Sequence, residues 1–169
     1  LYAAHPPAGV DRIAGTLGPE GWRHLLHPEL DPALTAIFEI IAPAAIDLAV
    51  ARLSIRERMG HPGAALKTHP RVAETVRRAA EILGAPVPRL FVGKRPGMVL
   101  GLAMTRPPSM LVDTAAVDAM LPQLLPFVAG KHLARQLPPL LARAVCPSIT
   151  ELTALFASAV RIGQGRTDE

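Results

Sequence analysis

Cysteine and aromatic residues are scarce in this sequence of 169 residues, and each scarcity excludes a class of structure. The single cysteine, Cys146, allows no disulfide within the chain and no cysteine-rich zinc site. It lies in the apolar run "LLARAVCPS", so we expect a small core residue there. Aromatic residues make up 4% of the chain, so leucine, alanine, valine and isoleucine must fill the core.

The sequence also lacks a cluster of like charges. The formal net charge is +4, but the arginines and lysines are spread along the chain with no stripe of aromatic residues beside them. A nucleic-acid-binding surface needs cations gathered on one face, so we expect no nucleic-acid partner. Half of the residues are apolar and 19% are charged, which predicts a folded domain with a sizeable core.

No signal-peptide pattern is present, and because the sequence begins with Leu1 we interpret it as part of a longer protein. Its most apolar stretch, residues 34–53, contains Glu39, Pro43 and Asp47 at four-residue spacing. Two carboxylates on one helix face would be costly inside a bilayer. We therefore expect a core helix with one polar edge, no transmembrane span and a cytoplasmic location.

Residues 1–30 are rich in proline, glycine and histidine, which favours short helices and turns. His24 and His27 have a spacing that can chelate a metal on a helix, but Pro28 interrupts and no third ligand is indicated. We expect no metal site in this stretch.

Asp31 and Pro32 predict the N-cap and first position of a helix that Pro43 should kink or split. The glycines and prolines of residues 60–63 predict a loop, our best internal boundary. We accordingly divide the chain into an N-terminal helical arm or extension, residues 1–66, and a second domain, residues 67–169. One continuous domain is the alternative.

An amphipathic helix is predicted within residues 69–84. Gly84 supplies its C-terminal cap and Pro86 prevents its continuation. Apolar residues recur in it at helical spacing, namely Val72, Val76, Ala79, Ala80 and Leu83.

Three short β-prone runs follow, "RLFVG", "MVLGLAMT" and "SMLVD", separated by the turn sequences "KRPG" and "RPP". They predict a small antiparallel β-meander from about Arg89 to Asp113. Helices return afterwards, and Ser148 with Glu151 predicts a capping box at the start of the last one. The expected fold class is α+β, mainly α, with a helical core and this small meander.

Three segments carry a resemblance that covers roughly residues 68–137. They are "AAEILGAPVPRLFV", "PPSMLVDTAAVDAML" and "LPFVAGKHLARQL". In order and apolar pattern they resemble the HtpX and CAAX-prenyl-protease group of zinc metallopeptidases, the gluzincins. The third segment is similar to the "F-V-L-G-H-E-L-A-H" helix of that group, and it matches at Phe127, Val128, Gly130, Leu133 and Ala134. The resemblance implies a zincin-like half.

The family's chemistry needs two histidines four residues apart to hold zinc and a glutamate after the first as general base. Here those positions hold Lys131, His132 and Arg135. Neither a lysine ammonium nor a guanidinium has a lone pair for zinc, and His132 lies about 100° around the helix from Lys131. The resemblance therefore implies a degenerate motif with no catalytic residue, no metal and no cofactor. The family's third ligand, a glutamate, cannot be assigned, because Glu151 fits the role of a helix cap better.

We expect a non-catalytic pseudo-metallopeptidase domain that binds or scaffolds within a larger bacterial protein. Its partner would be another protein or an adjacent helical-repeat domain of the same chain. One alternative is a metallopeptidase homologue that retains some hydrolase activity. However, ordinary structural roles suffice for the possible nucleophiles Ser109, Ser148 and Cys146, and no G-x-S-x-G motif occurs. The other alternative is a purely structural helical domain.

If the family fold is kept, Lys131 and Arg135 should project towards the former zinc cleft. Two cations brought together in a partly desolvated groove are costly unless they are compensated. A carboxylate should then approach one of them, supplied by a partner or by this chain, with the candidates Asp113, Asp118 and Glu151. The alternative is that both long side chains extend into water.

Overall fold

A computed structural model describes the chain except for residues 1–14, 26–29, 53–63, 94–96, 147 and 167–169. The described part is mostly helical with one three-stranded sheet, which confirms the expected α+β, mainly α class. The elements are α1 (Pro19–Leu25), α2 (Pro32–Arg52), α4 (Pro70–Leu83), β1 (Leu90–Val92), β2 (Leu100–Ala103), β3 (Ser109–Val112), α5 (Thr114–Ala119), the 3₁₀ helix η1 (Pro122–Leu124), α6 (Leu125–Ala134), α7 (Pro138–Val145) and α8 (Ile149–Gly163).

The sheet has the strand order β1-β3-β2 and is mixed. β3 pairs with β2 in antiparallel fashion, with Leu100 opposite Val112, and with β1 in parallel fashion, with Leu90 opposite Met110. The expectation of an antiparallel meander is therefore wrong. The outer edge of β1 is occupied by residues 64–66, whose backbone exchanges hydrogen bonds with Leu90 and Val92, so only its inner edge is left for β3.

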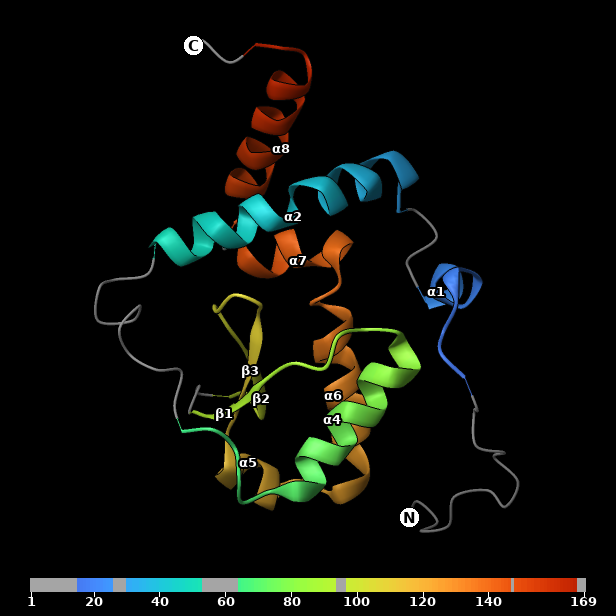
Figure 1. The fold of residues 1–169 in the computed structure, drawn as a ribbon, viewed down its shortest axis with the longest axis vertical. Coiled ribbons are helices and arrows are strands. Elements are labelled where there is room, and N and C mark those ends of the chain that lie inside the picture. The colour runs from blue at the N-terminus through green and yellow to red at the C-terminus, as the bar shows by residue number, and fades with distance from the viewer. Residues whose placement is uncertain (1–14, 26–29, 53–63, 94–96, 147, 167–169) are drawn as a thin grey trace.

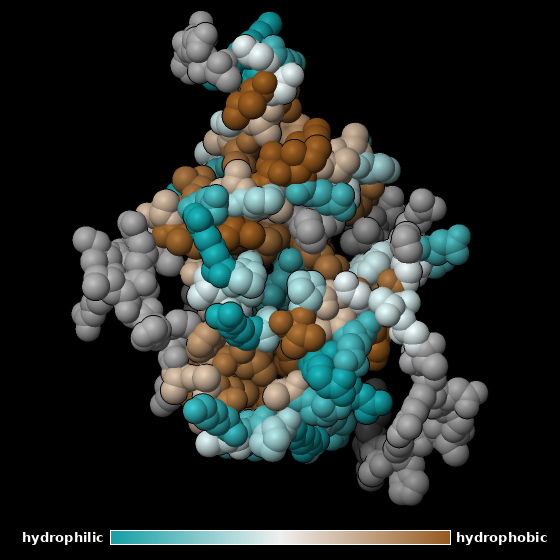
Figure 2. Space-filling model, viewed as in Figure 1, coloured by the Kyte–Doolittle hydropathy of each residue, from teal (hydrophilic) through white to brown (hydrophobic). Residues whose placement is uncertain are grey.

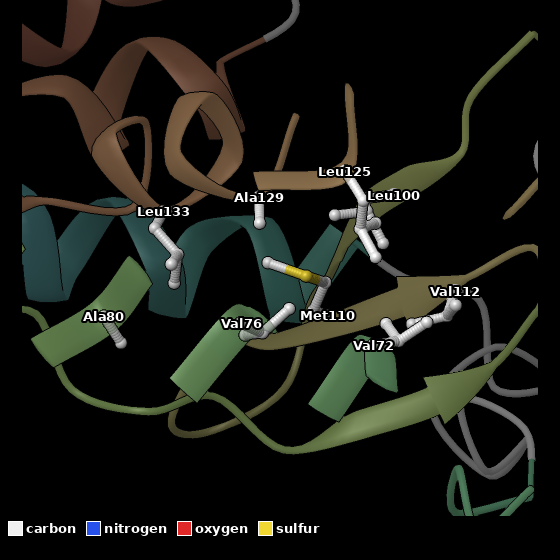
Figure 3. Packing of buried hydrophobic residues seen from close by; sticks show 9 residues of the cluster. All are labelled: Val72, Val76, Ala80, Leu100, Met110, Val112, Leu125, Ala129 and Leu133. Atoms are coloured by element: carbon white, nitrogen blue, oxygen red, sulfur yellow. The ribbon is translucent and has the colours of Figure 1, made fainter. Parts of the chain in front are cut away.

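Helices α4 and α6 pack against each other and against the sheet (Figure 1). The predicted apolar stripe of α4 is confirmed, with three residues buried and two more packed partly buried beside them. Figure 3 shows the core side chains gathered between the two helices and the strands. The buried cluster consists of Val72, Val76, Ala80, Leu100, Met110, Val112, Leu125, Ala129 and Leu133.

The predicted C-terminal cap of α4 is also confirmed. Gly84 has φ +63°, and its backbone N–H donates to the carbonyls of the last helical turn. A Cβ at Gly84 would lie 2.8 Å from Cγ2 of Thr16, so both the conformation and the space favour glycine.

Helix α2 lies across α7, and α8 extends away from both (Figure 1). The side chain of Asp31 accepts hydrogen bonds from the N–H groups of Ala33 and Leu34 at 2.7 and 3.2 Å, which confirms the predicted N-cap. The helix continues through Pro43, so the alternative of a split at that residue is wrong.

The expectation of a core helix at α2 is wrong as well. Ala42 and Ala45 are its only buried residues, and Ile40 is 78% exposed. Figure 2 shows hydrophobic surface in the region of α2 and α8. The cause is compositional: α2 is apolar on nearly all sides, so its sequence marks no single face for burial. Small alanines provide the face that approaches α7.

Within the described part of the chain, α2 is the one helix long and apolar enough to cross a membrane, with a mean hydropathy of 1.9. Signal sequences and buried helices of soluble proteins meet the same criteria. The absence of a transmembrane span therefore stays a prediction.

The start of α8 confirms half of the predicted capping box. Ser148 Oγ accepts a hydrogen bond from the N–H of Glu151 at 3.2 Å. The carboxylate of Glu151 accepts instead from Arg52, with Nη1 and Oε1 3.0 Å apart. The last helix is thus joined to the end of α2 by an ion pair. Cys146, just before it, is buried as expected.

The rotation of α6 about its own axis can be tested by two alanine substitutions on that helix. Leu133 is 1% exposed and Phe127 is 70% exposed. Leu133→Ala should lower the free energy of unfolding by about 2–5 kcal/mol, because it leaves a cavity. Phe127→Ala should stay within about 0.5 kcal/mol of the parent protein. Urea denaturation followed by circular dichroism measures both, and equal losses would mean that α6 presents a different face to the core.

Candidate functional site

Helix α6 carries the three residues at the metallopeptidase motif positions, and its two faces have different surroundings. Leu125, Ala129 and Leu133 follow one another at four-residue spacing and face α4 and the sheet. On the remaining surface Lys131 is exposed and His132 is half-buried. The burial of Leu133 therefore sets the direction of the polar residues on either side of it.

Arg135, at the second of the two zinc-ligand positions of the motif, does not lie inside the helix. The sequence predicts a helix that runs to about Leu137, but α6 ends at Ala134 and Arg135 is its C-cap. The Arg135 N–H still reaches the Lys131 carbonyl at 3.4 Å, so the two residues remain one turn apart. Pro138 then begins α7, and a proline at the start of a helix is compatible with the missing N–H.

A groove of about 550 Å³ lies beside the C-terminal end of α6. It is bounded by α6, by α7, by the strand β2 and by Met98, which lies two positions before that strand. Its lining residues are Met98, Leu102, His132, Arg135, Gln136, Leu140, Arg143 and Ala144. Of the motif residues, His132 and Arg135 line this groove and Lys131 does not. The expectation that both Lys131 and Arg135 face one cleft is thus met only for Arg135.

The three carboxylates expected near these cations are engaged elsewhere. Asp113 caps α5 by accepting from the N–H of Ala116 at 3.1 Å. Asp118 Oδ1 lies 3.5 Å from Nε2 of His69, and Glu151 pairs with Arg52.

Among the described residues, no carboxylate forms an ion pair with Lys131 or Arg135, and both side chains are exposed. The hypothesis of a compensating carboxylate from this chain is therefore wrong there. Extension into water is the arrangement observed.

His132 has a pKa below its ordinary value of 6.5. Burial is the main cause, because it disfavours the charged imidazolium, and the positive charges of Arg135 and Lys131 add to the effect. At neutral pH the ring is therefore uncharged and offers one donor and one acceptor nitrogen to the groove.

Arg143 of α7 is a groove residue that the sequence did not single out. Its Nη1 donates to the carbonyl of Cys146 at 3.3 Å, which holds the guanidinium near the end of α7. Leu141 and Ala142 are buried while Arg143 is exposed. No sequence signal brought Arg143 and Arg135 to the same groove.

Among the described residues, each of the three candidate nucleophiles has surroundings that fit a structural role. Burial and the charge of Glu151 raise the pKa of the Cys146 thiol, partly opposed by Arg52 and Arg143, so it stays protonated at neutral pH. Ser109 is buried and receives a hydrogen bond from Thr105 at 2.6 Å, and Ser148 caps α8. No histidine hydrogen-bonds to any of the three within the described ranges.

A metal site is likewise not formed by the residues whose structure is described. No group of three or more histidine, cysteine, aspartate or glutamate residues is close enough to hold an ion. His24 is exposed, and His27 lies outside the described residues.

No family model matches the chain, and neither a curated protein nor a solved structure matches it. The resemblance to gluzincins stays a prediction that rests on the three segments quoted above. Because the sheet is mixed, an antiparallel meander no longer supports that resemblance.

The environment of His132 predicts a pH dependence of stability. Because its folded-state pKa lies below the unfolded value of 6.5, the unfolded chain binds the proton first as the pH falls. The stability is thus intact above that value and is lost as the pH falls from it towards the folded pKa. Between pH of about 7.5 and about 5.5, the parent protein should lose more unfolding free energy than His132→Gln, which lacks the titrating group.

Arg135→Gln is the matched test of the cause, since it removes a cation that lowers the pKa of His132 and leaves the ring in place. The pKa of His132, followed by NMR, should rise in this variant and remain below 6.5, because burial persists. A native pKa at or above 6.5 in the parent protein would contradict the burial of the ring.

Proposed function

We propose that this chain is a non-catalytic, pseudo-metallopeptidase-like binding domain of a larger bacterial protein, in the cytoplasm. The observation that carries the proposal is the pair of cations, Lys131 and Arg135, at the two positions where a zinc peptidase of this kind needs histidines. A hydrolase cannot use them in that role, because neither residue offers a lone pair to a metal.

The groove at the end of α6 supports binding as the remaining use of this site. Its volume of about 550 Å³ falls in the range of about 300–1,000 Å³ of ligand sites in proteins. It combines an apolar wall with a few convergent polar groups, as such sites do.

The non-catalytic part of the proposal is tested by metal content and by rebuilding the motif. Protein purified without a tag should contain well under one zinc ion per chain by elemental analysis, because lysine and arginine repel the ion. The triple variant Lys131→His, His132→Glu, Arg135→His should not gain proteolysis of an unfolded casein substrate, since no third ligand is at hand.

The triple variant with the central glutamate replaced, Lys131→His, His132→Gln, Arg135→His, is the matched control. Any cleavage that depends on zinc and on that glutamate would show a third ligand in place. Stoichiometric zinc in the parent protein, resistant to mild chelation, would overturn the proposal outright.

A further inference from the structure

Among the described residues, the groove at the end of α6 is lined by cationic groups and by no acidic one. Arg135 and Arg143 line it from α6 and α7, His132 lies beside them, and none of its lining residues is acidic. The acid that acts electrostatically near Arg143 is Glu151, which raises the pKa of Cys146 while Arg143 lowers it. Glu151 is paired with Arg52 at 3.0 Å and is not among the residues that line the groove.

Both arginines keep donors for a ligand. A guanidinium has five N–H donors in a planar fork, and Arg143 uses one of them on the Cys146 carbonyl. Arg135 is exposed, and it forms no ion pair with another of the described residues. Two guanidinium groups in the lining of one groove suit a carboxylate, because each fork can donate two parallel hydrogen bonds to it.

The rest of the lining is apolar. Met98 and Leu102 contribute from the side of β2, and Leu140 contributes from α7. A free inorganic anion would leave this wall in contact with water. An occupant that matches the whole groove therefore carries a carboxylate with apolar groups next to it.

We propose that this groove binds an acidic peptide segment of a protein partner. A glutamate or aspartate of the segment would pair with Arg135 and Arg143, and a neighbouring apolar side chain would pack on Met98, Leu102 and Leu140. Charge complementarity favours an acidic side chain, and because the groove is partly open, the bound segment can continue beyond it. The inference rests on the proposed function and names the class of partner for that binding domain.

Two capped tripeptides that differ in one group provide the probes. They are acetyl-Leu-Glu-Leu-amide and acetyl-Leu-Gln-Leu-amide, which have the same size and apolar groups. Each is titrated into ¹⁵N-labelled protein to about 10 mM, enough to detect a Kd of about 1 mM. The backbone amide signals of the groove residues report where the peptide binds. Sodium acetate and sodium decanoate are titrated separately, so that a free anion and a fatty acid are distinguished from a peptide.

The glutamate peptide should shift the signals of Leu102, His132 and Gln136 and bind about tenfold more tightly than the glutamine peptide, because it adds charge-assisted hydrogen bonds. Arg135→Gln and Arg143→Gln should each weaken its binding by about the same factor. Both residues are exposed, so both variants should fold, which circular dichroism checks. Lys131→Gln is the matched control: it removes the same charge from the same helix at a residue outside the groove.

Equal affinity for the two peptides would overturn the inference, as would an absence of shifts in the groove. So would a loss in Lys131→Gln as large as that in Arg135→Gln, which would indicate general attraction to a basic surface. Acetate or decanoate binding as tightly as the glutamate peptide would overturn the assignment of a peptide.

The two proposals fail separately. Zinc content and proteolysis, measured on the same protein, decide the non-catalytic assignment, and the peptide titration decides the ligand.

Discussion

The contact between α4 and α6 is the constraint on which the rest of the structure depends. Ala80 and Ala129 are fully buried, and small side chains at such positions let two helices approach closely. Met110 of the central strand reaches the same cluster from the sheet and is also fully buried (Figure 3). Interiors are packed too densely for either helix to rotate freely, so this contact fixes the rotation of α6.

The rotation of α6 then determines whether each motif residue faces the core, the groove or solvent. With Leu133 directed into the core, the preceding residue His132 is half-buried at the edge of the groove, and Lys131 points to solvent. Arg135, at the C-cap, enters the groove lining as the helix ends. The contact between α4 and α6 thus decides which cation lines the groove and which one faces water.

Two acids of the helical half, Asp47 and Glu151, form ion pairs with arginines that do not line the groove. Asp47 of α2 pairs with Arg106 at 2.7 Å, and Glu151 of α8 pairs with Arg52. All four side chains are partly or largely exposed, so each pair adds little to stability. None of the described ion pairs involves Arg135 or Arg143, so the positive charge of the groove has no partner among them.

Local signals in the sequence predicted much of the fold. The stripe of α4, its cap at Gly84 and the N-cap at Asp31 all depend on residues within a turn or two of one another. The strand topology could not be predicted in the same way, because the outer edge of β1 is occupied by residues 64–66, more than twenty positions earlier. Similarly, no local pattern could place Arg143 and Arg135 in one groove, since that depends on how α7 packs after Pro138.

A zinc site and an anion site make opposite demands on the same turn of helix. Zinc needs lone pairs from neutral imidazoles and a carboxylate, whereas a carboxylate ligand needs N–H donors and positive charge. Arg135 satisfies the second set, and neither Lys131 nor Arg135 satisfies the first. His132 is held neutral by burial and by its cationic neighbours, so it can donate to an anion without adding a further desolvated charge. The polar residues of α6 that line the groove are therefore consistent with recognition of an acid. The apolar residues that hold α6 against the core need no metal to do so.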